Sequence, residues 1–224
     1  VRDRQRPLRR DLVVGYGLSR LRLTVERSER IVAEARRRSR YHNRGRRVVE
    51  AGLFEALAAS GREELDPGEV QSRLRQDPAV REALERMWPV LTPAELLHDL
   101  YGSKGLLELA GRRHLDADEV ASLHRARSES VDAVVWPVDD VPLLDEARAV
   151  LGATPRARRH GDTDDVRTYG HIVVDEAQDL SPMQLRMLGR RSLNGSMTIV
   201  GDIAQSTGAW AHASWDEVLD QLPE

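Results

Sequence analysis

The 224-residue sequence contains no cysteine. This absence excludes disulfide frameworks, thiolate nucleophiles and cysteine-based zinc sites. No apolar run approaches the roughly 18 residues that a membrane helix needs, and the first residues are basic without the apolar stretch of a signal peptide. We therefore expect a cytoplasmic protein with no membrane contact, and the length allows one large domain or two smaller ones.

Lysine is almost absent, because Lys104 is the only lysine among 34 basic residues. A phosphate-binding loop of the Walker A type needs Gly-Lys followed by serine or threonine. Lys104 stands between Ser103 and Gly105, so the sequence predicts no such loop. The basic start at Val1 also leads us to expect a segment of a longer protein.

Charge is unevenly distributed along the chain. Residues 1–50 hold 16 arginines and 6 acidic residues, a balance of +10, whereas the whole chain carries −3. A basic segment on an acidic body is typical of a contact with a polyanion. The alternative is a solvated, arginine-rich helix face.

In the first 60 residues, the spacing of apolar residues changes from one typical of strands to one typical of helices. Residues 12–25 contain Val13 and Val14 and then Leu21, Leu23 and Val25 in strict alternation, which predicts a hairpin or edge strands. Residues 26–42 have a helical period with Ile31, Val32 and Ala35 on one face. The stretch His42–Gly45 is expected to break this pattern before a second helix over 46–60.

Residues 62–151 are expected to be entirely helical and built from short pieces. The segment Thr92–Glu95 is a capping box with proline at the first helical position. Pro142 opens a helix that should stop at Gly152. The polar residues 153–168 then predict a linker or loop.

The last part of the chain has a different pattern. The runs HIVVD (171–175) and MTIVGD (197–202) are short and apolar, which is typical of buried strands. Helices are predicted to start at Ser181 and Ser214, each followed by a glutamine or glutamate at the third helical position. Strand, helix and strand at this spacing indicate a βαβ unit with parallel strands in an α/β domain.

Acidic residues follow the first of these strands. Carboxylates at the carboxyl end of a parallel strand face the crevice where α/β proteins bind ligands. Asp175 and Glu176 are adjacent and should diverge, so that one can hold Mg²⁺ while the other faces an attacking water. The alternative is that acidic residues here only cap the following helix.

Polar residues also follow the second strand. Gly201 permits a tight turn beside a ligand. Asp202 and Gln205 should lie at the carboxyl end of the neighbouring strand, level with Asp175. A neutral amide placed there can contact a terminal phosphate.

The sequences VVDEAQD (173–179) and IVGDIAQS (199–206) resemble motifs II and III of superfamily 1 helicases of the UvrD/Rep type. The resemblance implies ATP and Mg²⁺ as cofactors. It implies that Asp175 ligates the metal and that Glu176 activates the hydrolytic water. It also implies that Gln205 contacts the γ-phosphate and that Asp202 supports the site.

Three further stretches, 3–14, 96–107 and 136–152, resemble the HelD/HelR branch, whose members are ATPases that displace and recycle RNA polymerase. The fold implied is α/β, a partial RecA-like P-loop NTPase domain with a mostly α-helical insertion. The implied divisions are part of the first RecA-like domain (1–25), a clamp-opening-like helical insertion (26–135), a return helix and linker (136–168), and the RecA-like core with motifs II and III (169–224).

The chain departs from the family pattern in informative ways. The Walker A element and the second RecA-like domain are missing, so we expect the isolated chain to be inactive. Motif III continues through Gly208 and Ala211 where unwinding relatives carry tyrosine and arginine, while Trp210 keeps the position of a base-stacking aromatic. Packing of Trp210 with Trp215 is the alternative.

Three functions remain open at this point. The first is a HelD-like motor with RNA polymerase as its partner. The second is a fragment of a UvrD-like helicase that moves on single-stranded DNA. The third is a non-enzymatic interaction module whose ATP motifs are inert.

Overall fold

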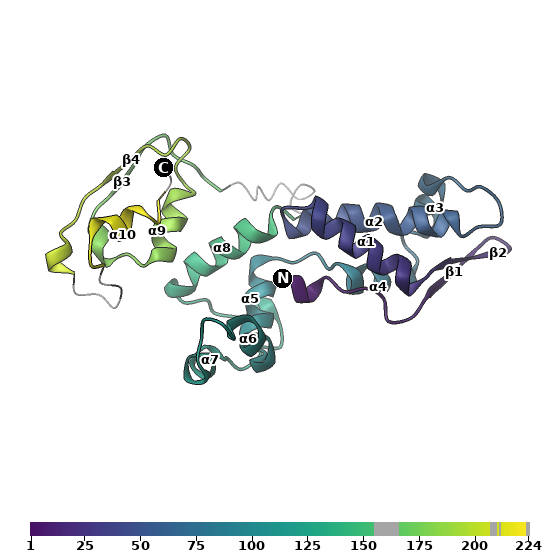
Figure 1. Cartoon of the computed structure of the whole chain (residues 1–224), viewed down its shortest axis with the longest axis horizontal. Coiled ribbons are helices and arrows are strands. Elements are labelled where there is room, and N and C mark those ends of the chain that lie inside the picture. Colours follow the sequence, from purple (N-terminus) through teal and green to yellow (C-terminus); the bar gives the residue numbers. More distant parts are fainter. Residues whose placement is uncertain (155–165, 207–209, 211, 223–224) are drawn as a thin grey trace.

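The computed structural model describes residues 1–154, 166–206, 210 and 212–222. Most of the expected linker, together with Gly208 and Ala211, lies outside these residues. The molecule is elongated (Figure 1): a hairpin forms one end, two parallel strands lie at the other, and helices fill the space between.

The predicted hairpin is confirmed. Strands β1 (Leu12–Tyr16) and β2 (Ser19–Leu23) follow the short 3₁₀-helix η1 (Arg2–Arg4) and pair antiparallel, with Leu12 opposite Leu23. The turn passes through Gly17 at φ +60°, a conformation that glycine adopts without strain. Leu21 and Leu23 are buried on one face, as the alternation predicts.

Two long helices follow. The first, α1 (Val25–Arg38), buries Ile31, Val32 and Ala35 as predicted. The second, α2, spans His42–Ala59, so the expected helix break at His42–Gly45 is wrong. Gly45 lies inside α2, and the indole of Trp88 packs against it. Only glycine leaves room for this ring, because a Cβ atom at position 45 would be 2.3 Å from Trp88 Cζ2.

Short capped helices continue the chain, as predicted. Thr92 and Glu95 form the expected capping box, and the last of these helices stops at Gly152, which has φ +72°. Between residues 124 and 137 only one 3₁₀ turn is helical, so the expectation of entirely helical structure is wrong there. The elements are α3 (Pro67–Leu74), α4 (Pro78–Met87), α5 (Pro93–Tyr101), α6 (Lys104–Gly111), α7 (Ala117–Leu123), η2 (Val131–Ala133), η3 (Val138–Asp140) and α8 (Val141–Leu151). No helix in the described ranges is long and apolar enough to cross a bilayer.

The last segment forms the predicted strand–helix–strand unit. Strands β3 (Ile172–Val174) and β4 (Met197–Ile199) are parallel neighbours. Helices α9 (Pro182–Gly189) and α10 (Trp215–Leu219) lie to one side of them (Figure 1). The expected burial of both strand faces is wrong, because Val173 is 67% exposed. Its neighbour Val174 faces the helices and is buried, whereas Val173 points to the opposite face of the sheet.

Three apolar clusters divide the described residues. The first joins the hairpin to α1–α4, so the hairpin that the resemblance assigns to a RecA-like domain shares its core with helices. The second joins α5, α6, α7 and α8. The third joins β3, β4, α9 and α10. The fold is therefore mixed α/β, mostly helical with a small parallel sheet.

Candidate functional site

The two stretches that follow β3 and β4 run side by side. The N–H of Val200 donates to the carbonyl oxygen of Val174 at 2.8 Å, and the N–H of Ala177 donates to that of Val200 at 3.1 Å. These bonds extend the contact between the two segments past the strand ends. They bring Asp175 and Asp202 to the same edge of the sheet, where the sequence placed them.

A buried glutamine joins the two segments. Gln178 is 1% exposed, and its Nε2 donates to Glu176 Oε2 at 2.7 Å. Its Oε1 accepts the backbone N–H of Asp202 at 3.0 Å. One side chain thus satisfies both of its polar ends by linking the segment after β3 to the segment after β4, as a buried amide requires.

The sequence reasoning missed Gln178, although Gly201 carried a signal for it. A Cβ atom on Gly201 would lie 2.2 Å from Gln178 Oε1. The glycine therefore makes room for the glutamine side chain, in addition to any role beside a ligand. A glycine after one strand can indicate that a side chain from the neighbouring segment fills its place.

Glu176 has a left-handed backbone, with φ 54° and ψ 41°. It is the single non-glycine residue with positive φ among those described. This conformation costs about 1–3 kcal/mol and persists where the surroundings hold it, most often at functional sites. The bond from Gln178 and the one that the Glu176 N–H donates to Asp175 Oδ1, at 3.0 Å, hold the turn.

The residues after β4 form a second small network. Asp202 caps the 3₁₀-helix η6 (Ile203–Gln205), and its Oδ1 accepts the N–H of Ala204 at 2.9 Å. Its Oδ2 accepts a bond from Gln205 Nε2 at 2.8 Å. The structure therefore brings Asp202 and Gln205 together, and this bond orients the exposed amide of Gln205.

The exposed carboxylate of Asp175 fits one part of a nucleotide site. Mg²⁺ keeps several waters, so one protein carboxylate together with phosphate oxygens can hold it. No group of three or more metal-ligating side chains occurs in the described ranges. Lys104 lies in the first turn of α6, which packs against α5 and α7. The residues present therefore fit a hydrated ion and a water, but not a phosphate cradle.

Trp210 is 59% exposed. A tryptophan with this exposure offers a ring face to a ligand, and the described residues place it in a turn between η6 and α10. The flanking positions Gly208 and Ala211 lie outside the described residues, so the comparison with the tyrosine and arginine of unwinding relatives stays at the level of sequence.

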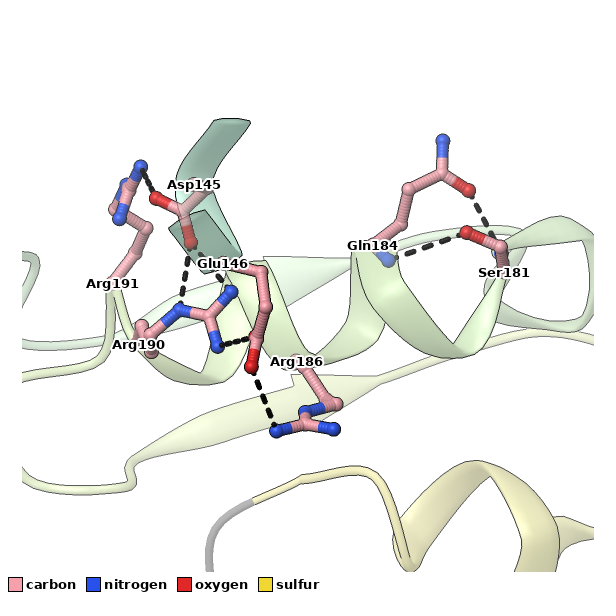
Figure 2. Close-up of polar contacts among 7 residues, drawn as sticks. All are labelled: Asp145, Glu146, Ser181, Gln184, Arg186, Arg190 and Arg191. Carbon is pink, nitrogen blue, oxygen red and sulfur yellow. Dashed lines mark hydrogen bonds and ion pairs between the residues drawn. The ribbon is translucent and has the colours of Figure 1, made fainter. Parts of the chain in front are cut away.

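Helix α9 begins directly after motif II. Its capping box is formed by Ser181, which accepts the N–H of Gln184 at 3.3 Å, and by Gln184, whose Oε1 accepts the N–H of Ser181 at 2.7 Å (Figure 2). The box fixes where the helix starts relative to the motif II turn.

Comparison with known families agrees with this geometry. Residues 158–222 match the family model of the UvrD/REP helicase N-terminal domain. The matched segment is less than half of the chain and contains both strands and the segments that follow them. This part of the chain is therefore similar to the N-terminal domain of UvrD/REP helicases, a class that uses ATP with Mg²⁺ and interacts with nucleic acid. No curated protein matches the chain.

Proposed function

We propose that residues 169–224 supply the metal- and water-binding half of the ATP site of a superfamily 1 motor. The observation that carries this proposal is the Gln178 bridge, which links the strained Glu176 to Asp202. A buried amide that fixes two exposed acidic turns at one sheet edge is expected where carboxylates must be preorganised.

Each residue has a distinct part in this proposal. Asp175 holds Mg²⁺ through its exposed carboxylate, and Glu176 accepts a proton from the attacking water. Gln205, oriented by Asp202, contacts the terminal phosphate. When bound, Mg²⁺ with ATP supplies the transferable phosphoryl group and neutralises its charge.

The test is a pair of substitutions in the intact protein. Glu176→Gln keeps the shape of the side chain and removes its basicity, so ATP hydrolysis should be lost while ATP binding is kept. Asp175→Asn should weaken Mg²⁺-dependent binding as well. Hydrolysis at the wild-type rate in Glu176→Gln would contradict the assignment.

For the partner, we propose RNA polymerase, displaced from nucleic acid by a HelD-like motor. Support comes from the helical part, a folded body in which two long helices, α1 and α2, are followed by short capped helices, and which extends away from β3 and β4 (Figure 1). Its sequence mixes acidic residues with arginine after residue 62, unlike a continuous phosphate-binding stripe.

A UvrD-like helicase that moves on single-stranded DNA is the second candidate. The exposure of Trp210 favours it, since a free indole can stack on a base. A pull-down with core RNA polymerase, compared with duplex and single-stranded DNA across a salt series, separates the two. Retention of the polymerase at moderate salt supports the first candidate, and tight DNA binding without polymerase supports the second.

A further inference from the structure

Helices α8 and α9 are joined by a row of alternating charges (Figure 2). We call the residues Arg191, Asp145, Arg190, Glu146 and Arg186, in this spatial order, the α8–α9 ion-pair chain. Asp145 accepts bonds from Arg191 Nη2 and, at 2.7 Å, from Arg190 Nε. Glu146 accepts bonds from Arg190 Nη1 at 2.7 Å and from Arg186 Nη2 at 3.2 Å.

One of the two carboxylates in the α8–α9 ion-pair chain is buried. Asp145 is 7% exposed and contacts the guanidinium groups of Arg190 and Arg191, so its charge is compensated only while α9 and the two residues that follow it are in place. Removing one side of a buried ion pair leaves an uncompensated charge, which is strongly unfavourable. The position of α9 on α8 is therefore specified by these bonds.

The clustered apolar residues of the two helices belong to different cores. Leu143 and Ala147 of α8 belong to the cluster with α5–α7, and Leu185 and Leu188 of α9 belong to the cluster with β3, β4 and α10. These two clusters have no residue in common. Buried ion pairs fix geometry and add little net stability compared with apolar contacts, and separation of the two helices at these ion pairs would leave both clusters intact.

Helix α8, which carries the two carboxylates of the α8–α9 ion-pair chain, is bonded at both ends to the helical part. At the start of α8, Asp140 is 2% exposed and forms a two-point ion pair with Arg125. At its end, Gly152 O accepts a bond from Asn43 Nδ2 of α2 at 3.1 Å. Helix α8 therefore moves with α2 and with the segment that precedes it.

The arginines of the α8–α9 ion-pair chain lie on and directly after α9, which is connected to motif II. Ser181, the N-cap of α9, lies two residues after the motif ends at Asp179. The carbonyl oxygen of Arg191 accepts the N–H of Tyr169 at 2.8 Å, just before β3 begins. A shift of the arginines would therefore reach both ends of the segment that holds Asp175 and Glu176.

We propose that the α8–α9 ion-pair chain is a releasable joint that sets the position of the helical part (1–151) relative to motifs II and III and couples it to the conformation of motif II. The term motif II rests on the proposed function. The joint itself requires no nucleotide, so it can be tested even if the ATP assignment fails.

The position of the two parts is measured in the 224-residue chain by pulsed electron paramagnetic resonance. The absence of cysteine allows spin labels at Glu108→Cys on α6 and Asp216→Cys on α10, both at exposed positions. The unmodified joint should give one narrow distance distribution. Asp145→Ala should at least double its width, and the milder Asp145→Asn should broaden it less while keeping the fold.

Two controls separate the joint from a general loss of structure. Glu34→Ala removes an exposed ion pair with Arg38 within α1 and should leave the distribution unchanged. Arg190→Ala with Arg191→Ala should broaden it at least as much as Asp145→Ala does, because this pair also removes the bond from Arg190 to Glu146. Adding Asp145→Ala to these two substitutions should broaden it no further, because both partners of Asp145 are already gone. The proposal would be overturned by an unchanged width in Asp145→Ala or by a distribution that is already broad before any substitution. Additive broadening in the combined variant would also overturn it.

Hydrogen exchange on the same variants tests the coupling. The segment 172–180 contains the Ala177 N–H that bonds to Val200. Its exchange should speed up at least severalfold in Asp145→Ala and stay unchanged in Glu34→Ala. Unchanged exchange despite a broadened distance distribution would overturn the coupling.

Discussion

A Cβ atom on Gly201 would lie 2.2 Å from Gln178 Oε1, so the side chain of Gln178 can link the two strand ends only while position 201 is glycine. Gly201→Ala should therefore displace Gln178 or shift the backbone. We expect the free energy of unfolding to fall by about 1–3 kcal/mol, the usual cost of forcing extra atoms into a packed site. Urea denaturation measures it.

The matched control is Gly105→Ala. Gly105 lies in α6, and a Cβ atom added to it would meet no other group within 4 Å. Alanine in a helix is favoured over glycine by about 0.5–1 kcal/mol, so this variant should be more stable. Equal effects of the two substitutions would show that the Gln178 contact does not matter.

A second prediction concerns nucleotide chemistry in the 224-residue chain. Positioning and charge neutralisation account for nearly all catalysis of phosphoryl transfer, and this chain has no lysine loop. We expect no ATP turnover and, at best, affinity for Mg²⁺ with ATP of about millimolar strength. Phosphate release and calorimetry measure these quantities. Turnover that disappears in Glu176→Gln would refute the prediction, whereas turnover that persists there indicates a contaminant.

A third prediction concerns the contact between α2 and Trp88. Trp88 is 1% exposed, its Nε1 donates to His42 O at 2.7 Å, and its ring occupies the space beside Gly45. Gly45→Ala should lower the free energy of unfolding by about 1–3 kcal/mol, since the ring cannot move without losing that bond. Thermal melts should show it, and Gly15→Ala, at a strand position with free space, should not be destabilised in this way.

The sequence predicted those features whose signals are local. The alternation of residues 12–25 defined the hairpin, and the Thr92–Glu95 capping box defined the start of α5. Asp175 and Asp202 were placed at one sheet edge because parallel strands bring their carboxyl ends together.

Other features depend on contacts between distant residues and could not be predicted in this way. Gly45 looked like a helix breaker until Trp88 was placed beside it. The role of Gln178 as a bridge depends on its bond to Asp202 in the segment after β4, which no local sequence pattern indicates. The pairing of Asp145 with Arg190 joins positions far apart in the chain, and neither residue shows a local pattern that identifies its partner.

The last prediction is a dependence of stability on pH that arises from His42. Burial lowers the pKa of His42 below its ordinary value near 6.5, and the hydrogen bond to the carbonyl of Pro89 opposes this only in part. The ring is 4% exposed, stacks on Trp88 with centroids 5.2 Å apart, and has Gln5 Nε2 at 3.2 Å from its Nδ1. A neutral ring satisfies both contacts, donating through Nε2 to Pro89 O at 2.8 Å and accepting at Nδ1.

Because the folded-state pKa is depressed, the unfolded chain binds this proton at higher pH than the folded chain does. The stability that neutral His42 contributes is therefore fully present above about pH 6.5 and is lost as the pH falls through its lower, folded-state pKa. Urea denaturation at a series of pH values between about 7.5 and 5 should show the free energy of unfolding falling toward acid. His42→Gln should flatten this part of the profile, whereas His114→Gln, at an exposed position, should keep it. An unchanged slope in His42→Gln would assign the pH dependence to other groups.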